Sequence, residues 1–282
     1  MQIFKEIEPL RAFLVEKRRA GLSIGFVPTM GALHAGHLSL IVASRAQNQI
    51  TVCSIFINPI QFNNPNDLVS YPRTLDKDLT LLNSTGCDVL FCPDEAQMEM
   101  SVHSLLNFSF GTLETVMEGK FRPGHFNGVA KVVAKLLHIV EPDTAYFGQK
   151  DWQQFVIIRA LVEGLRFNVK LQSVETVREQ DGLAMSSRNL RLSEGQRKQA
   201  TLLYSSLCQA RQKLKAGDSI LSVKEFVNET FRSKADFSLE YFEVVDSENL
   251  MPLNNVHEAE RPMACIAAFA GNVRLIDNMF LL

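Results

Sequence analysis

The sequence of 282 residues lacks the features that mark membrane, secreted or nucleic-acid-binding proteins. No apolar run reaches the ~20 residues that cross a bilayer. The first six residues alternate apolar and charged side chains and contain no signal-peptide core. The formal net charge is only −2, which gives no general attraction for a polyanion such as tRNA. We therefore expect a cytoplasmic protein with no membrane and no nucleic-acid partner.

Cysteine is scarce and its spacing is uninformative. The five cysteines stand at positions 53, 87, 92, 208 and 265, and no pair has the two-residue spacing of a zinc or redox motif. Cys53 and Cys265 fall inside apolar, strand-like runs. The pattern predicts buried free thiols in a reducing compartment, with a cysteine nucleophile as a minor alternative. It argues against a zinc site or a disulfide framework.

Strand and helix patterns alternate through the first two thirds of the chain. The expected strands are 23–27, 50–57, 88–91, 145–147 and 169–174, and the expected helices are 38–47, 75–82, 129–139 and 153–165. The run 50–57 is apolar and β-branched, as in a strand covered on both faces. This alternation predicts an α/β fold with a Rossmann-like, doubly wound parallel sheet.

The pattern changes near residue 177. A polar loop at 182–189 is followed by a long helix that Ser193 would cap, and then by a helix through 223–231. Strands are expected at 239–245, 265–269 and 273–276. We therefore predict two domains: a Rossmann-like nucleotide-binding domain at 1–176 and a smaller C-terminal α+β domain at 177–282.

Two histidines mark the point where the first buried strand gives way to a helix. His34 and His37 flank Gly36 in the run 28–37, Pro-Thr-Met-Gly-Ala-Leu-His-Ala-Gly-His. A helix N-terminus attracts anions and favours neutral imidazoles, which can donate to phosphate oxygens. Gly36 leaves room for a phosphate near the backbone. We favour an anion site over the alternative of a capping histidine beside an exposed one.

Three further segments carry side chains suited to phosphate. Ser186, Ser187 and Arg188 combine two hydroxyls with a forked guanidinium, although an ordinary interdomain linker has similar composition. Lys150 follows a strand end and can reach a triphosphate as a point charge, and Asp151 beside it can cap the next helix. A nucleoside triphosphate is the anion that these segments suggest.

The remaining polar candidates are individually weaker. The amides of Asn58, Gln61 and Gln154 follow strand-like runs and can both donate and accept, as a small substrate with hydroxyl and carboxylate groups requires. Arg122 and His125, in a glycine-rich loop, are candidate contacts for phosphate or carboxylate, or parts of an ordered structural loop. Asp76 and Asp78 are candidate acidic groups at the same edge, with helix capping the expected role of Asp76.

Taken together, these blocks resemble one family. His34 to His37 is similar to the HxGH signature of nucleotidylyltransferases and class I synthetases, and Met185 to Arg188 to their second motif. The runs 27–37, 54–62, 71–74, 119–129, 150–154 and 178–189 resemble the pantoate–β-alanine ligase (pantothenate synthetase) family in particular. The resemblance runs in order over essentially the whole chain.

The resemblance implies a two-step reaction. The carboxylate of pantoate attacks the α-phosphate of ATP to give pantoyl adenylate and pyrophosphate, and the amine of β-alanine then gives pantothenate and AMP, a precursor step for coenzyme A. It implies that His37 is catalytic with His34 in support, that Gln61 and Gln154 bind pantoate, and that Gln61 also lies near β-alanine. It also implies that the first domain holds pantoate and that the C-terminal domain acts as a lid.

The resemblance further implies an ATP site, Mg²⁺ arriving with ATP, no tightly bound organic cofactor and a homodimer built through the first domain. The pattern gives no dedicated protein ligands for a metal, because Lys77 interrupts a segment that is more acidic in relatives. The residues that would line the ATP site are Met30, Gly31, Ala32, Leu33, His34, Ala35, Gly36, His37, Gly148, Gln149, Lys150, Asp151, Val177, Met185, Ser186, Ser187 and Arg188.

Three alternatives remain at this point. A plain nucleotidylyltransferase would make an adenylylated or cytidylylated product without the amide step, but the blocks around Gln61 and Gln154 follow the ligase pattern. A class I aminoacyl-tRNA synthetase would be expected to be longer and more basic. A nucleotide-sensing module would bind ATP without releasing pyrophosphate when pantoate is present.

Overall fold

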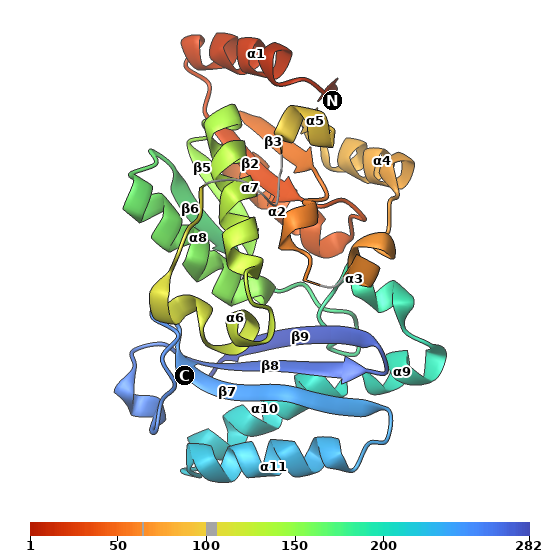
Figure 1. The fold of residues 1–282 in the computed structure, drawn as a ribbon, viewed down its shortest axis with the longest axis vertical. Helices are drawn as coiled ribbons and strands as arrows, with labels where there is room; N and C mark the ends of the chain where they lie inside the picture. The colour runs from red at the N-terminus through yellow and green to blue at the C-terminus, as the bar shows by residue number, and fades with distance from the viewer. Residues whose placement is uncertain (64, 100–105) are drawn as a thin grey trace. The chain divides into compact units, whose positions relative to one another are not determined.

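A parallel sheet forms the centre of the first of two compact units (Figure 1). The structure is a computed structural model that describes residues 1–63, 65–99 and 106–282. Unit 1 comprises Met1–Glu114, Glu118–Gln149 and Gln154–Glu175, and unit 2 comprises Thr115–Met117, Lys150–Gln153 and Thr176–Leu282.

All six strands of the sheet in unit 1 run parallel, in the order β1-β4-β3-β2-β5-β6. They are β1 (Gln2–Phe4), β2 (Ile24–Thr29), β3 (Ile50–Ile55), β4 (Val89–Phe91), β5 (Thr144–Gly148) and β6 (Lys170–Val174). Strand order reverses at β2, with β3 on one side and β5 on the other. The predicted Rossmann-like sheet is therefore confirmed, and its reversal marks the edge where ligands of such sheets bind.

Helices cover both faces of this sheet. Figure 1 shows α7 in front of the sheet and α2 behind it, and the contacts pair α1 with α7 and α2 with α4. The helical segments are α1 (Ile7–Arg19), α2 (Ala35–Gln47), η1 (Pro59–Gln61), α3 (Pro65–Val69), α4 (Leu75–Thr85), α5 (Glu95–Met98), η2 (Gly111–Glu114), α6 (Met117–Phe121), α7 (His125–Val140), η3 (Gln149–Asp151) and α8 (Trp152–Leu165).

Burial explains the apolar run of β3. Val52 and Cys53, which point to opposite faces, are both fully buried, as the two-sided covering requires. Cys53 of β3 and Val27 of β2 share one apolar cluster with Leu40 and Ile41 of α2 and Leu82 of α4. The expected helix at 38–47 begins three residues earlier, because His34 caps it. The short strand β1 and helix α1 were not predicted from the sequence.

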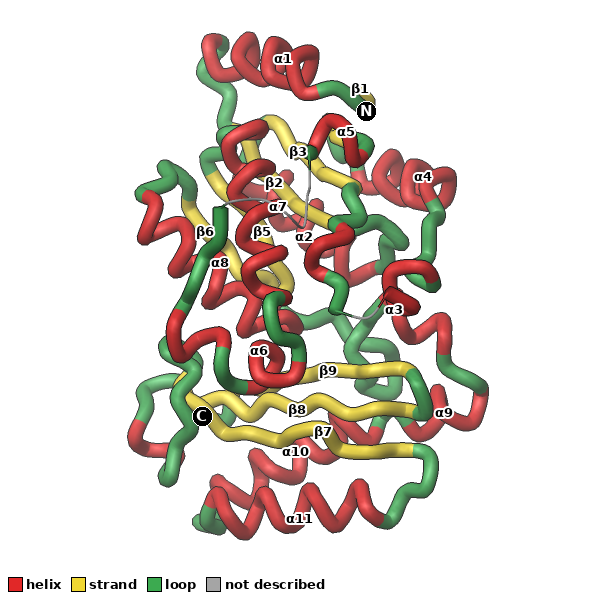
Figure 2. The backbone as a smooth tube through the Cα atoms, viewed as in Figure 1, coloured by secondary structure: helices red, strands yellow, loops and turns green. Residues whose placement is uncertain are grey.

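Unit 2 is built on an antiparallel sheet in the order β7-β8-β9. Its elements are η4 (Ser187–Arg191), α9 (Glu194–Gln199), α10 (Leu202–Lys215), α11 (Ile220–Arg232), β7 (Phe237–Asp246), η5 (Val256–Glu258), β8 (Pro262–Ala270) and β9 (Val273–Phe280). Figure 2 shows α10 and α11 running along the strands, and their apolar faces share one core with them. The long helix expected after Ser193 is two helices, separated at Ala200 and Thr201.

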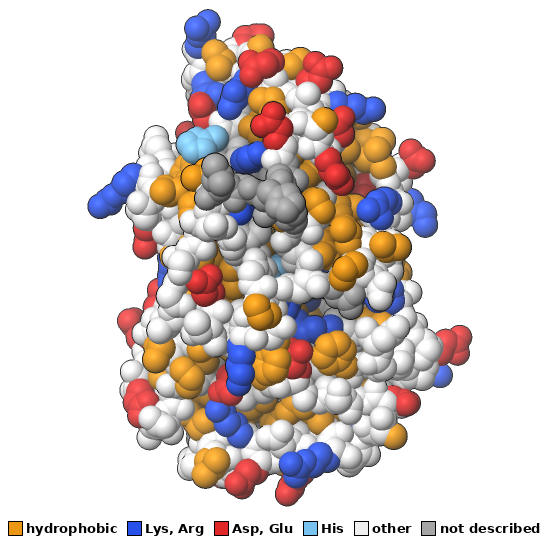
Figure 3. All heavy atoms as spheres, viewed as in Figure 1, with side chains coloured by type: hydrophobic (Ala, Val, Ile, Leu, Met, Phe, Trp, Pro, Cys, Tyr) orange, Lys and Arg blue, Asp and Glu red, His pale blue; other side chains and the backbone are white. Residues whose placement is uncertain are grey.

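The surface carries charges of both signs. On the face shown in Figure 3, acidic and basic side chains are interspersed, in keeping with the net charge of −2. Among the described residues, we find no helix that combines the length and the apolar character needed to cross a membrane.

Candidate active site

The polar blocks of unit 1 follow the carboxyl ends of its central strands. The loop that begins at Met30 follows β2, Asn58 and Gln61 follow β3, and Gln149 follows β5. Because these strands are parallel and paired, with Thr29 opposite Ile55, their carboxyl ends lie at one edge. The sheet therefore brings the first histidine motif and the Gln61 block to the same edge, at the strand-order reversal.

The loop before α2 has an unusual backbone that a buried carboxylate supports. Gly31 and Ala32 both have positive φ angles, of 80° and 49°. Asp78, which is 1% exposed, accepts the backbone N–H of Ala32 on Oδ2 at 3.0 Å and that of Leu33 on Oδ1 at 2.8 Å. The left-handed conformation of Ala32 costs roughly 1–2 kcal/mol, which these charge-assisted hydrogen bonds offset. Asp78 of α4 thus holds the loop that leads to His34.

Glycine is required at position 31 for two reasons. Its φ of 80° lies in the left-handed region, and an added Cβ would lie 3.0 Å from Cγ2 of Ile55 and 3.2 Å from Oδ2 of Asp78. Thr29 Oγ1 accepts the backbone N–H of Gly31 at 3.2 Å and donates to the carbonyl of Ser54 at 2.8 Å. The loop is therefore fixed to β3 and α4 before α2 begins.

His34 and His37 cap the N-terminus of α2 with each other's help. His34 Nδ1 accepts the backbone N–H of Gly36 at 3.2 Å, and His37 Nδ1 accepts the backbone N–H of His34 at 3.3 Å. The two rings lie 4.1 Å apart, tilted by 40°. The capping role that the sequence offered as the alternative for one histidine is therefore real, and it accounts for the geometry of both.

These caps determine the tautomer of each ring. A ring nitrogen that accepts a backbone N–H carries a lone pair, so each imidazole is neutral and carries its proton on Nε2. Both rings are half-buried. Each ring therefore keeps an Nε2–H at the helix start, where the positive end of the α2 dipole favours an anion.

The amides of Asn58 and Gln61 form a buried pair beside this loop. Asn58 Nδ2 donates to the carbonyl of Gly128 and to Oε1 of Gln61, each at 3.0 Å. A carbonyl only accepts, which fixes the orientation of the Asn58 amide and, through it, that of Gln61. Gln61 Nε2 donates to Sδ of Met30 at 3.0 Å. Among the described residues, Asn58 Oδ1 is a buried acceptor without a hydrogen-bond partner.

A cleft in unit 1 opens next to these groups. Its volume is about 370 Å³, and Met30, Ala32, Phe56, Arg73 and Asp94 are among the residues that line it. Small-molecule sites start at roughly 300 Å³. The cleft is therefore large enough for a small organic acid or amine next to Met30.

The segment after β5 joins the two units along the chain. Gly148 and Gln149 belong to unit 1, Lys150 and Asp151 belong to unit 2, and Gln154 lies half-buried on α8 in unit 1. Lys150 Nζ lies 3.8 Å from Oδ2 of Asp151. The relation of Lys150 to the histidine pair thus stays a prediction.

The second motif is an ordered turn in unit 2. Ser186 caps η4, with its Oγ accepting the backbone N–H of Arg188 at 3.2 Å, and Ser187 is buried. Met185 donates its backbone N–H to the carbonyl of Val177 at 3.0 Å. The segment that the sequence presented as a polar loop therefore includes a 3₁₀ turn, which fixes the backbone of its two hydroxyl groups.

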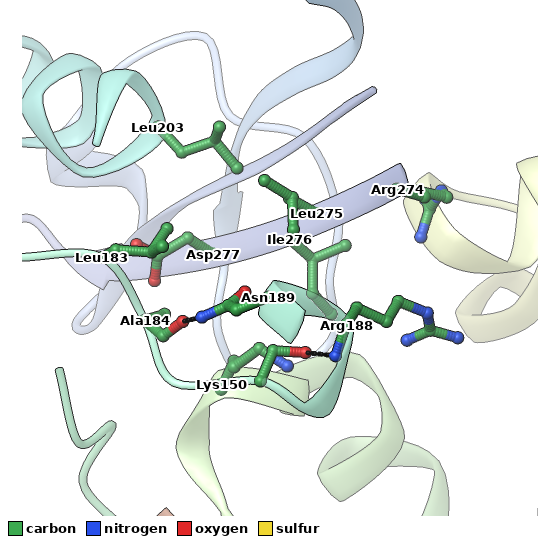
Figure 4. A pocket seen from close by; sticks show the side chains of 11 residues that line it. Lys150, Leu183, Ala184, Arg188, Asn189, Leu203, Arg274, Leu275, Ile276 and Asp277 are labelled. Carbon is green, nitrogen blue, oxygen red and sulfur yellow. Dashed lines mark hydrogen bonds between the residues drawn. The ribbon is translucent and has the colours of Figure 1, made fainter. Parts of the chain in front are cut away.

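Lys150 and the second motif line one small cavity in unit 2 (Figure 4). The cavity has a volume of about 10 Å³, and Lys150, Ser186, Arg188, Arg274 and Asp277 are among its lining residues. Two residues from separate segments, Lys150 and Arg188, thus line the same cavity as Ser186. Ammonium and guanidinium groups are the side chains that bind phosphate oxygens.

An ion pair between the half-buried Arg178 and the buried Asp277, which lines this cavity, supports the cavity. Arg178 donates from Nη1 to Oδ2 of Asp277 at 2.6 Å and from Nη2 to Oδ1 at 2.9 Å. Burial raises the pKa of the Asp277 carboxyl above its ordinary value, and the hydrogen bonds from Arg178 act against that rise. Arg178 also forms a β-bridge with Ala184, and Asn278 Nδ2 donates to the carbonyl of Lys150 at 2.8 Å. Arg178 and Asp277 therefore tie the second motif to β9, and Asn278 ties Lys150 to the same strand.

All five cysteines are free thiols, and Cys53, Cys87 and Cys265 are buried. Burial raises the pKa of the Cys87 thiol to about 11 and that of Cys53 well above its ordinary value. A nucleophilic cysteine needs a lowered pKa, so the structure gives these two thiols no catalytic character.

Sequence reasoning missed the residues that act from a distance. Asp78 entered only as a possible acidic group, whereas it holds the loop before α2. Arg178 and Asp277 were not singled out at all. Each of these side chains works through a partner far along the chain, so no local pattern could have identified its role.

Known proteins of one family match this chain over nearly its full length. The model of the family described as pantoate-beta-alanine ligase matches residues 2–280. A pantothenate synthetase of Azobacteroides pseudotrichonymphae is 46% identical, over 99% of each chain. One from Bacteroides fragilis is 44% identical, over 99% of this chain and 98% of its own.

Solved structures give the same result. The pantothenate synthetase of Thermus thermophilus superimposes with a TM-score of 0.93 and 40% identity, covering 100% of this chain and 99% of its own. The pantoate-beta-alanine ligase of Francisella tularensis, complexed with beta-gamma ATP and beta-alanine, superimposes with a TM-score of 0.82 and 36% identity. The match covers 99% of this chain and 97% of its own. The reaction of this family is the ATP-dependent condensation of pantoate with β-alanine. A family match of this extent, with relatives aligned end to end, places the chain in the pantoate-beta-alanine ligase family.

Proposed function

We propose that this chain activates pantoate as its adenylate on the α2 N-terminus and then transfers the pantoyl group to β-alanine. The observation that carries the proposal is the pair of Nε2–H groups of His34 and His37, which the caps hold in the neutral form. They are fixed donors at a helix N-terminus, where charge on a triphosphate is stabilised. The ATP and β-alanine bound to the Francisella relative support the same substrates here.

The first step depends on the positioning of pantoate against ATP and does not need a general base. Pantoate is already a carboxylate at neutral pH, and one of its oxygens attacks the α-phosphorus while the bond to the β-phosphate breaks. His37 donates to the phosphate region as charge shifts to the leaving pyrophosphate, and His34 supports the neighbouring oxygens. Positioning and charge stabilisation then supply most of the rate enhancement, without a covalent enzyme intermediate.

The second step joins carbon to nitrogen. The amine of β-alanine attacks the acyl carbon of the adenylate, the carbon–oxygen bond to phosphate breaks, and AMP leaves with that oxygen. The amine loses its proton to solvent. One oxygen of the original carboxylate therefore ends on AMP.

Pantoate would lie against the buried amides. Gln61 Nε2 keeps its second hydrogen for a carboxylate or hydroxyl oxygen, and the buried Asn58 Oδ1 offers an acceptor for a hydroxyl. Pantoate carries both hydroxyl and carboxylate groups, so it matches this donor and acceptor pair. We assign Gln154 to the same substrate, and β-alanine to the side of Gln61 that adjoins the cleft at Met30.

The triphosphate would be shared between two groups of residues. The loop from Met30 to His37 in unit 1 would face it, with Gly148 and Val177 near the adenosine. Lys150, Ser186, Ser187 and Arg188 would hold its phosphates, while Gln149, Asp151 and Met185 would complete the site. The common cavity of Lys150 and Arg188 supports this grouping. We propose that residues 1–176 bind nucleotide and pantoate and that residues 177–282 act as the lid.

Mg²⁺ would arrive with ATP. Among the described residues, no group of three or more His, Cys, Asp or Glu side chains could hold a metal ion, and both oxygens of Asp78 accept backbone N–H groups. The residues present therefore fit a cation carried mainly by phosphate oxygens, which would neutralise part of the triphosphate charge. We also propose a homodimer, supported by the family, and a cytoplasmic location, supported by the free thiols.

Product analysis tests the proposal. The purified protein is incubated with ATP, Mg²⁺ and pantoate, with and without β-alanine, and the products are separated by liquid chromatography and mass spectrometry. We expect AMP, pyrophosphate and pantothenate in equal amounts only when all three substrates are present. ADP, or an adenylylated product that persists in the presence of β-alanine, would contradict it and favour a plain nucleotidylyltransferase.

A further inference from the structure

A buried histidine lies directly behind Gln61. His125, the first residue of α7, is 6% exposed, and its Nδ1 lies 2.9 Å from the backbone carbonyl oxygen of Gln61. Its Nε2 lies 3.1 Å from Nη1 of Arg122. Arg122 Nη1 in turn lies 3.7 Å from Oε2 of Glu118, which is also buried. A chain of three polar side chains therefore ends on the backbone of a residue that the proposed function places against pantoate.

The chemistry of its two partners fixes the state of His125. A carbonyl oxygen only accepts, so Nδ1 must carry a hydrogen, and a guanidinium only donates, so Nε2 must carry a lone pair. His125 is therefore neutral with its proton on Nδ1, the opposite tautomer to those of His34 and His37. Only this tautomer satisfies both contacts at once.

Packing makes the position of Gln61 depend on the start of α7. An added Cβ on Gly128 would lie 2.7 Å from the carbonyl oxygen of Ile60 and 2.9 Å from Cα of Gln61, so α7 touches this backbone directly. Asn58, which orients the Gln61 side chain, also donates to the carbonyl of Gly128. The first turn of α7 thus holds Gln61 both at its carbonyl and through Asn58.

We propose that His125 is a positioning residue for the acid substrate: held neutral by Arg122, it fixes the Gln61 backbone and so aims the Gln61 amide at pantoate. This inference rests on the proposed role of Gln61. It gives the charged, glycine-rich segment 118–128, which was expected to be a loop and which the structure divides between α6 and the start of α7, a function in substrate selection without direct contact with the reacting atoms.

The test compares His125→Leu with His125→Asn. Leucine removes both ring nitrogens, whereas asparagine places its Nδ2–H near the former Nδ1 and keeps the donor to Gln61. Loss of one hydrogen bond corresponds to about a tenfold effect. We expect His125→Leu to raise KM for pantoate about tenfold and KM for ATP less than about twofold. His125→Asn should recover most of the pantoate KM. His138→Leu, an exposed site on the same helix, is the matched control and should leave both constants unchanged.

Two outcomes would overturn the proposal: equal KM effects on both substrates in His125→Leu, or His125→Asn behaving like His125→Leu. If His125→Leu fails to fold by circular dichroism, His125→Asn and Arg122→Met carry the test. Arg122→Met leaves the Nδ1 donor in place, and we expect a rise of about threefold in pantoate KM only. An unchanged pantoate KM in Arg122→Met would contradict the proposed role of Arg122.

Pantoate binding measured by calorimetry separates this inference from the proposed function. Weaker pantoate binding in His125→Leu, with unchanged binding of ATP, supports the positioning role even if the wild type makes no pantothenate. Unchanged pantoate binding in His125→Leu overturns the inference even if the wild type is fully active. Absence of pantoate binding in the wild type would overturn both.

Discussion

Asp78 Oδ1 accepts the backbone N–H of Leu33 across 2.8 Å, joining the first turn of α4 to the loop in front of α2. Asp78 Oδ2 makes the equivalent contact with the residue before Leu33. Asp78 is 1% exposed, and its carboxylate holds the loop at the wall of the unit 1 cleft. The helix start that carries both histidines is therefore set by a side chain 45 residues away.

Asp78→Asn should uncouple the loop from α4. The amide has one acceptor oxygen, and its NH₂ group would face a backbone N–H, leaving a buried donor unsatisfied at a cost of roughly 1–3 kcal/mol. We expect urea unfolding to show this loss and kcat to fall, since His34 and His37 move with the loop. Asp76→Asn, exposed in the same helical turn, is the control and should resemble the wild type. Equal behaviour of the two variants would refute the role of Asp78.

His37→Ala should slow turnover strongly. Loss of one donor that stabilises developing charge lowers kcat by roughly 10²–10³-fold. His34→Asn separates the capping role of His34 from its proposed role in catalysis, because asparagine is a favourable N-cap and retains an acceptor for the Gly36 N–H. We expect His34→Asn to keep the wild-type melting temperature while losing activity. Turnover near the wild-type value in His37→Ala would contradict the catalytic role of His37. If His34→Asn loses stability in proportion to its loss of activity, His34 serves only as the helix cap.

Arg178→Met should destabilise unit 2 and weaken ATP use. The change leaves the buried carboxylate of Asp277 without the two hydrogen bonds from the Arg178 guanidinium, which lowers the free energy of unfolding by roughly 3 kcal/mol. Because Arg178 anchors the segment before Ser186, KM for ATP should rise as well. Arg197→Met breaks the exposed pair with Asp181 and should cost less than about 1 kcal/mol. The double change Arg178→Met with Asp277→Leu should recover stability but not ATP affinity; recovery of both would show that the pair serves folding alone.

Alkaline pH should weaken the fold through Cys87. Burial raises the pKa of its thiol from 9.0 to about 11, so between these values the unfolded chain releases a proton that the folded chain keeps. Stability from this group is therefore fully present below pH 9 and is lost as pH rises toward 11, by at most roughly 3 kcal/mol. Urea unfolding of the wild type and Cys87→Ala at pH 8 and pH 10.5 measures it. The stability difference between the two proteins should shrink with pH, and a constant difference would contradict the assignment.

Local patterns predicted the parts of the site that lie on single segments. The strand at 24–29 and the helix after it follow from apolar spacing, and the histidine pair could be placed at their junction. The early start of α2 escaped prediction because histidine is an uncommon N-cap. The break between α9 and α10 escaped it too, since the residues on either side fit one continuous helix.

Support from distant residues could not be predicted. The contact of His125 with Gln61 spans 64 residues, and that of Arg178 with Asp277 spans 99. Such pairs depend on how elements pack, which no local periodicity encodes. The residues proposed to bind substrates could thus be predicted from the sequence, whereas the residues that position them could be identified only from the structure.

The most direct test of adenylate formation follows the oxygen atoms. Pantoate labelled with ¹⁸O in its carboxylate is converted with ATP and β-alanine, and the AMP is analysed by mass spectrometry. Attack of the carboxylate on the α-phosphorus predicts one ¹⁸O atom in each AMP formed. AMP without label would contradict a pantoyl adenylate and, with it, the role assigned to the paired histidines.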